Sequence, residues 1–178
     1  MARTETNWIQ TASGRRFWPT DPRSEDVCIE DIGHALAMKC RFSGHTKSFY
    51  SVAQHSLLVS ENVSPEYAKV ALLHDAAEAY FADVAKPIKR EYPVFDEIEG
   101  MILLAVFQRF DLHLPLPDVV KRIDMVLLAT ERRDLMAHPR LECNILEGVV
   151  PLREVIRPLC VSEANALFMA RAAELGLR

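Results

Sequence analysis

The chain has 178 residues, 49% of them apolar, which is enough for one domain with its own core. Its net charge of −4 excludes an overall attraction to nucleic acid or to an anionic membrane, and no stretch is long enough to span a bilayer. Residues 1–10 lack the apolar centre of a secretory signal, and the four cysteines have no paired spacing. We therefore expect a single cytoplasmic domain over residues 1–178, with reduced thiols.

The N-terminal segment, residues 1–27, differs in pattern from the rest of the chain. Aromatic and β-branched residues over 6–10 and 15–18 flank a turn that contains Gly14. This pattern predicts a small β-hairpin. The prolines of residues 19–22 then interrupt regular structure, so the remainder of the segment is expected to be extended.

From about residue 28 onward, apolar residues recur every three or four positions, which predicts helices. After a first helix, a second is expected over residues 51–62. A third begins at Ser64-Pro65-Glu66, where Ser suits the cap and Pro the first turn, and runs to about Tyr80. Pro87 is expected to end any continuation.

Two long helices are predicted over residues 93–111 and 117–137, because both segments are apolar-periodic and prolines separate them. Residues 138–160 contain three prolines and are expected to form a looser connection. Ser162 is the expected cap of a last helix, and Gly176 fits its end. The predicted fold is all-α, a helical bundle with a small N-terminal β-hairpin.

Two imidazoles and two carboxylates lie within these apolar stretches: His55, His74, Asp75 and Asp124. A carboxylate buried without a partner is costly, and a shared cation would remove that cost. Taken singly, each residue has a simpler explanation, since a lone histidine is often a satisfied core residue and Asp124 could be a surface acid. The His74-Asp75 pair is more specific, and Glu78 shares its helix face.

The order of these residues resembles the HD-domain superfamily of metal-dependent phosphohydrolases. Its signature is a histidine, a His-Asp doublet and a distant aspartate, all on helices. Here the doublet follows His55 by 19 residues, and Asp124 follows Asp75 by 49. The resemblance covers roughly residues 40–134 and implies that these four side chains bind one metal ion.

Within that superfamily the chain is most similar to bacterial 5′-deoxynucleotidases. Arg41-Phe42 matches their Arg-Trp pair, residues 74–78 match their His-Asp-Ala-Ser-Glu, and Asp83 precedes a Pro-Ile-Lys segment as in their loop. Phe42 replaces the family's Trp, and residues 43–54 differ from the family pattern.

The expected roles follow from the chemistry of the groups and from this resemblance. Glu78 is the candidate catalytic residue, which would orient the attacking water or take its proton. Arg41 suits a phosphate because its planar fork matches phosphate geometry. The expected substrate-binding residues are Arg41, Phe42, His45, Asp83, Lys86 and Lys89. The alternatives are a surface acid for Glu78, a loop-capping role for Asp83 and solvated side chains for the arginine and lysines.

The mixed nitrogen and oxygen ligands favour one transition-metal ion, such as Mn, Co, Fe, Ni or Zn, over Mg. Four protein ligands would leave positions open for water and a phosphate oxygen. Further histidines that would indicate a second metal are not evident.

The leading hypothesis is a phosphohydrolase that removes phosphate from a small phosphomonoester, above all a nucleoside 5′-monophosphate, by attack of a metal-bound water. The alternatives are a nucleotide pyrophosphohydrolase, or a regulatory module that binds a nucleotide without turnover. The expected partner is a small phosphorylated substrate, with no nucleic-acid polymer and no membrane. A homodimer is possible through the apolar run at residues 102–106.

Overall fold

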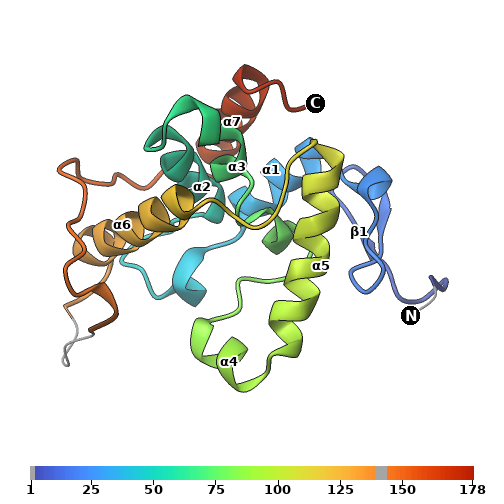
Figure 1. The fold of residues 1–178 in the computed structure, drawn as a ribbon, viewed down its shortest axis with the longest axis horizontal. Helices are drawn as coiled ribbons and strands as arrows, with labels where there is room; N and C mark the ends of the chain where they lie inside the picture. The colour runs from blue at the N-terminus through green and yellow to red at the C-terminus, as the bar shows by residue number, and fades with distance from the viewer. Residues whose placement is uncertain (1–2, 139–143) are drawn as a thin grey trace.

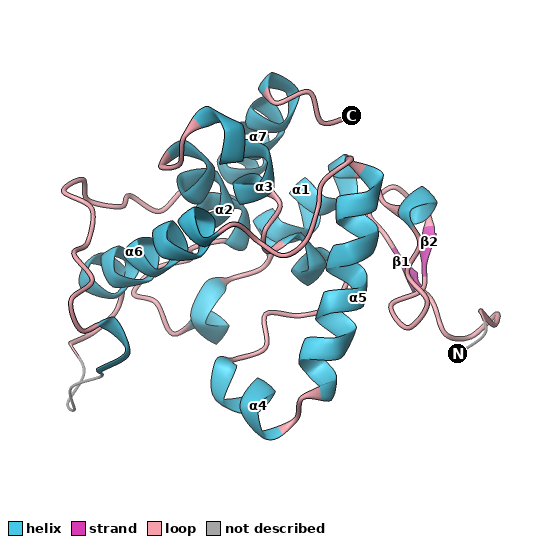
Figure 2. Cartoon of the chain, viewed as in Figure 1, coloured by secondary structure: helices cyan, strands magenta, loops and turns pink. Residues whose placement is uncertain are grey.

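The computed structural model describes residues 3–138 and 144–178. Its described elements are β1 (Ile9–Gln10), β2 (Arg16–Phe17), α1 (Ile29–Met38), α2 (Val52–Glu61), α3 (Ala68–Leu72), α4 (Lys86–Glu91), α5 (Val94–Arg109), α6 (Asp118–Leu135) and α7 (Val161–Glu174), with short 3₁₀ turns that include η2 (Arg41–Gly44) and η4 (Ala76–Ala79). The predicted all-α fold with a small hairpin is confirmed (Figures 1 and 2). None of the described helices is long and apolar enough to cross a membrane.

The N-terminal hairpin forms as predicted, although its strands are short. Ile9 pairs with Phe17 in antiparallel register, and Gly14 adopts a positive φ of 83° in the turn, a conformation that glycine tolerates best. Phe17 is fully buried and stacks on Tyr80 with ring centroids 3.9 Å apart. The hairpin therefore belongs to the same core as the helices.

The main core joins the hairpin to α1, α2, η4, α5 and α7. Gly33 lets α1 approach α7 closely, because a side chain there would meet Met169 at 2.8 Å. A smaller apolar cluster joins α2, α3 and α6 through Val59, Ala71 and Leu127. This second cluster holds together α2 and α6, which carry His55 and Asp124, and α3, which leads into the His74-Asp75 turn.

The predicted continuous third helix is wrong. α3 ends at Leu72, and Leu73 and Asp75 leave helical geometry before η4 begins. In a continuous helix the Ala71 carbonyl would accept a hydrogen bond from the Asp75 amide. Instead it accepts one from Nδ1 of the His74 side chain at 2.7 Å. The His-Asp doublet therefore lies in a turn between two short helical segments.

Two predicted boundaries need correction. Pro87 does not end a helix but lies in the first turn of α4, a position that needs no amide hydrogen. α7 is capped by Cys160 rather than Ser162, and the Glu163 carboxylate accepts a hydrogen bond from the Cys160 amide as in a capping box. Gly176 follows the end of α7 with a φ of 71°, as predicted.

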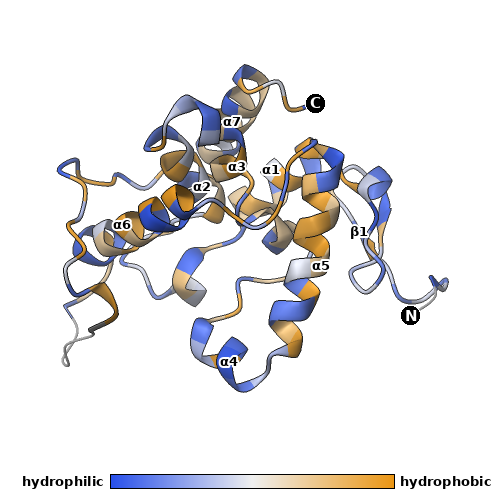
Figure 3. Ribbon diagram, viewed as in Figure 1, coloured by the Kyte–Doolittle hydropathy of each residue, from blue (hydrophilic) through white to orange (hydrophobic). Residues whose placement is uncertain are grey.

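α4 and the adjoining end of α5 extend away from the rest of the bundle (Figure 1). α4 is mainly hydrophilic, whereas α5 carries many hydrophobic residues (Figure 3). Within the apolar run at 102–106, Ile102, Ala105 and Val106 are buried and only Leu104 is exposed. Most of the run is therefore occupied by this chain's own core, and the homodimer stays a prediction.

Residues 144–160 contain one 3₁₀ turn, η5 (Asn144–Leu146), and otherwise follow the looser path that was expected. Cys28, Cys40 and Cys160 are free thiols. Cys143 and the rest of 139–143 lie outside the described residues.

Candidate metal centre

Three of the predicted ligands meet where α2, α3 and α6 come together. His55 lies in α2, His74 follows α3 and Asp124 lies in α6, and each offers a ligand atom within 4.8 Å of the other two. Nε2 of His55 is 3.3 Å from Nε2 of His74 and 3.2 Å from Oδ1 of Asp124. Both imidazoles are buried. Such a group could hold a metal ion.

Asp75, the fourth predicted ligand, lies against the same atoms. Its Oδ2 is 3.3 Å from Nε2 of His74 and 3.6 Å from Nε2 of His55. Adjacent residues inside a helix diverge by about 100°. Because the chain leaves the helix at Leu73, His74 and Asp75 reach the same point. The structure thus brings all four predicted side chains together.

The hydrogen bonds of the two imidazoles direct both Nε2 atoms toward the centre of the group. Nδ1 of His74 carries the hydrogen, because its partner, the Ala71 carbonyl, can only accept. Nδ1 of His55 lies 2.6 Å from a carboxylate oxygen of Glu131 and is a donor for the same reason. Two Nε2 lone pairs 3.3 Å apart repel unless a proton or a cation lies beside them. The donor set therefore fits a cation.

The charged groups around His55 determine whether a proton lies between the two Nε2 atoms in the metal-free protein. Burial and Arg41 lower the pKa of His55, but Glu131 and Asp124 outweigh them and raise it to about 9. Burial raises the pKa of Asp124, yet His55 holds it below its ordinary value, and the two imidazoles do the same for Asp75. Because Nδ1 already donates to Glu131, the second proton of the His55 imidazolium lies on Nε2 in the metal-free protein at neutral pH, and a metal ion would have to displace it.

Glu78, the predicted catalytic residue, lies in η4 and is buried. Its Oε2 has no hydrogen-bond partner among the described residues. Burial, with help from Asp75 and Asp83, raises the pKa of Glu78 to about 9. Lys39 donates to the backbone oxygens of Glu78 and Phe81 and so fixes the turn that carries the carboxyl group.

A cavity of about 700 Å³ adjoins the group. This volume is typical of small-molecule sites, which span roughly 300–1,000 Å³. Its wall includes the ligand candidates His74, Asp75 and Asp124, together with Glu78. All six predicted substrate-binding residues also line it: Arg41, Phe42, His45, Asp83, Lys86 and Lys89. The fully buried His55 is not part of this wall.

Arg41 and Phe42 occupy a strained turn at the edge of this cavity. Phe42 and Ser43 adopt positive φ values of 54° and 51°, which are rare for residues other than glycine. The Arg41 guanidinium lies 3.3 Å from Asp75 and 3.3 Å from Glu131. Arg41 is therefore held in place by two acids and is not the solvated side chain of the alternative interpretation.

The chain is similar to two bacterial proteins over nearly all of its length. It is 39% identical over 171 residues to the uncharacterized protein YfdR of Escherichia coli (strain K12), a match that covers 95% of this chain and 96% of YfdR. The chain belongs to the YfdR family. It is also 33% identical over 183 residues to the uncharacterized protein RCAP_rcc00048 of Rhodobacter capsulatus, covering 92% of this chain and 93% of that protein. No family model matches the chain.

One buried acid of this YfdR-family chain, Glu131, was not predicted from the sequence. Glu131 lies in α6 with no exposed surface and contacts His55, Tyr50 and Arg41. The available signal was its position seven residues after Asp124, which places both acids on one face of the helix.

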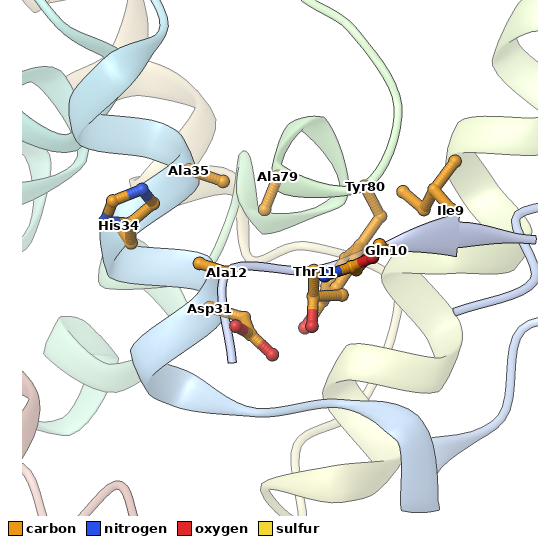
Figure 4. Close-up of a pocket in the computed structure, with 9 residues that line it drawn as sticks. All are labelled: Ile9, Gln10, Thr11, Ala12, Asp31, His34, Ala35, Ala79 and Tyr80. Carbon is orange, nitrogen blue, oxygen red and sulfur yellow. The ribbon is translucent and has the colours of Figure 1, made fainter. Parts of the chain in front are cut away.

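A second, smaller cavity lies between the hairpin and α1 (Figure 4). Its volume is about 300 Å³, and its wall contains Asp31 and His34. Asp31 accepts hydrogen bonds from the amide and hydroxyl of Ser13 at 2.6 and 2.8 Å. This carboxylate already has its hydrogen-bond partners, unlike Oε2 of Glu78 at the larger cavity.

Proposed function

We propose that this YfdR-family chain is a metal-dependent phosphohydrolase that acts on a small phosphomonoester, with nucleoside 5′-monophosphates as the leading substrates. The observation that carries the proposal is the group formed by the buried imidazoles of His55 and His74 and the partly exposed carboxylate of Asp124. This group adjoins a cavity whose wall also contains Arg41 and Glu78. A cation site with room for a ligand and a fixed guanidinium suits an anionic substrate.

His55, His74, Asp75 and Asp124 would hold the metal, and the mixed ligand set favours Mn, Co, Fe, Ni or Zn. A bound divalent ion supplies two things here, polarisation of a phosphoryl oxygen and activation of a water molecule. The two carboxylates offset the charge of the ion. The Nδ1 hydrogen bonds of the imidazoles direct both Nε2 atoms toward the ion, which would displace the Nε2 proton of His55.

Arg41 would bind the phosphate oxygens. Its contacts with Asp75 and Glu131 fix the guanidinium at the cavity wall before substrate arrives, which lowers the cost of ordering it. Lys86 adds positive charge at the wall, whereas Lys89 pairs with Glu99. Phe42 and His45 would contact the remainder of the substrate, and Asp83 would accept a hydrogen bond from a sugar hydroxyl.

Glu78 would handle the proton. Its Oε2 is buried, free of hydrogen-bond partners among the described residues and on the cavity wall, so it can take or return a proton there. A cation beside Asp75 would counter the negative charge that helps to raise the pKa of Glu78, and so favour its ionised, proton-accepting form.

The test is a phosphate-release screen of metal-loaded protein against nucleoside monophosphates, sugar phosphates and nucleoside triphosphates. Release from monophosphates by wild type, with loss in Asp124→Asn, supports the proposal. Asp118→Asn is the matched control, because Asp118 is an exposed acid on the same helix. Pyrophosphate release from triphosphates would favour the pyrophosphohydrolase alternative. Nucleotide binding without any release would favour the regulatory module.

A further inference from the structure

Glu131 is a buried carboxylate placed directly behind one of the ligand candidates. It lies two helical turns beyond Asp124 on α6 and has no exposed surface. Its Oε1 is 2.6 Å from Nδ1 of His55 and accepts a hydrogen bond from the Tyr50 hydroxyl at 2.9 Å. Its Oε2 faces the Arg41 guanidinium at 3.3 Å. This carboxylate thus accepts hydrogen bonds from His55 and Tyr50 on Oε1 and forms an ion pair with Arg41 through Oε2.

Burying an ionised carboxylate is costly unless the surrounding groups offset it. Packing alone would favour an apolar side chain at this position, as at Val120 and Leu127 on the same helix. The three side chains that contact Glu131 therefore show what offsets its charge. Two of them, His55 and Arg41, also contact the Asp75 carboxylate, so Glu131 is linked to the site through both.

We infer that Glu131 is a positioning residue of the metal centre, which orients His55 and directs its Nε2 toward the ion. This inference rests on the metal site of the proposed function. The carboxylate accepts the Nδ1 hydrogen, which selects the tautomer with its lone pair on Nε2 and makes the imidazole a stronger donor to metal. Tyr50 and Arg41 in turn hold the carboxylate in the orientation that His55 requires.

The experiment measures affinity for Co²⁺ by its visible absorption in wild type, Glu131→Gln and Tyr50→Phe. Loss of the carboxylate should weaken Co²⁺ binding about 10–100-fold, the usual effect of removing such a partner. Tyr50→Phe removes one donor and leaves the His55 contact, so its loss should be smaller. Asp118→Asn is the control and should bind as wild type does. Circular dichroism of the metal-free proteins identifies the variants that fold.

A purely structural role for Glu131 would lower the melting temperature but leave the Co²⁺ affinity of the folded variant unchanged. That result would overturn the inference. If Glu131→Gln fails to fold, Tyr50→Phe is the deciding variant. An unchanged Co²⁺ affinity in Tyr50→Phe would then also overturn the inference. A wild-type protein that binds no Co²⁺ would refute the metal centre and this inference together. Co²⁺ binding without hydrolysis of any phosphomonoester would remove the proposed activity and leave the role of Glu131 standing.

The second readout is the imidazole proton spectrum of the Zn²⁺-loaded protein. In wild type the Nδ1 hydrogen of His55, held at 2.6 Å from Glu131, should give a strongly downfield resonance. The resonance should move upfield or vanish in Glu131→Gln and persist in Asp118→Asn. An identical resonance in Glu131→Gln would show that the carboxylate does not hold this hydrogen.

Discussion

Two buried acids of this molecule have opposite surroundings. Asp31, on α1, accepts hydrogen bonds from the amide and hydroxyl of Ser13 and so ties the hairpin to the bundle. Glu131, on α6, is bound by the side chains of His55, Tyr50 and Arg41. The first acid secures a backbone turn, whereas the second is connected to groups that can bind a cation or an anion. Burial of a carboxylate is therefore no guide to function until its donors are known.

The largest expected effect is loss of the metal. His74→Ala should remove bound metal from the purified protein and abolish the thermal stabilisation that added metal gives wild type. His34→Ala is the control, because His34 is an exposed histidine beside the other cavity. Elemental analysis and melting curves check this, and wild-type metal content in His74→Ala would remove His74 from the site.

Glu78→Gln should separate chemistry from binding. The change is nearly isosteric and removes only the ionisable group, so the fold and the metal should remain. Turnover should fall by roughly 10²–10⁴-fold, the usual contribution of general acid–base catalysis. Steady-state kinetics give the kcat of the variant, and metal analysis of the same sample shows whether the metal is still bound. An unchanged kcat would make Glu78 a bystander.

The metal-free protein should lose stability as the pH rises. The pKa of His55 is raised to about 9 from an ordinary value of 6.5. Its contribution to the free energy of unfolding is therefore complete below pH 6.5 and is lost as the pH rises through 9. The pKa of Glu78 is also raised, from 4.5 to about 9, so Glu78 likewise lowers the free energy of unfolding as the pH rises from 4.5 to 9. Chemical unfolding at several pH values should show this decline, and a smaller one in Glu78→Gln.

Metal affinity should follow the opposite course, because the ion must displace the His55 proton. Co²⁺ binding should therefore strengthen from pH 6.5 to 9. A free energy of unfolding that stays level or rises over this interval in the metal-free protein would contradict the assigned protonation of the site.

The smallest expected effect sharpens the contrast between the two acids. Asp31→Asn weakens the hydrogen bonds to Ser13 and should lower the free energy of unfolding by about 1–3 kcal/mol. Its Co²⁺ affinity should equal that of wild type. Denaturant titration and Co²⁺ binding measured together would reveal any coupling between the hairpin and the metal centre, and a clear loss of affinity would show that the two regions are not independent.

The amino-acid sequence by itself determined most of the elements and the set of ligand candidates. Apolar spacing every three or four residues predicted α1, α2, α5 and α6, because that spacing shows which face of a helix is buried. Histidine and aspartate within such stretches indicated a cation, because few other partners make their burial tolerable. Together with the resemblance to the HD-domain superfamily, this named the four ligand candidates without coordinates, although it did not name Glu131.

Only the tertiary structure decided how those side chains meet. Periodicity favoured a continuous helix through His74, but the Ala71 carbonyl accepts the imidazole hydrogen and the helix ends there. Glu131 looked like any acid on a long helix, because its partners Tyr50, His55 and Arg41 are distant in sequence and only folding brings them around it. Lys89 was expected to bind substrate, with a solvated side chain as the alternative, yet Glu99 on α5 pairs with it. A sequence pattern reports which face is buried, whereas the partner of each buried polar atom depends on chain segments that only folding brings together.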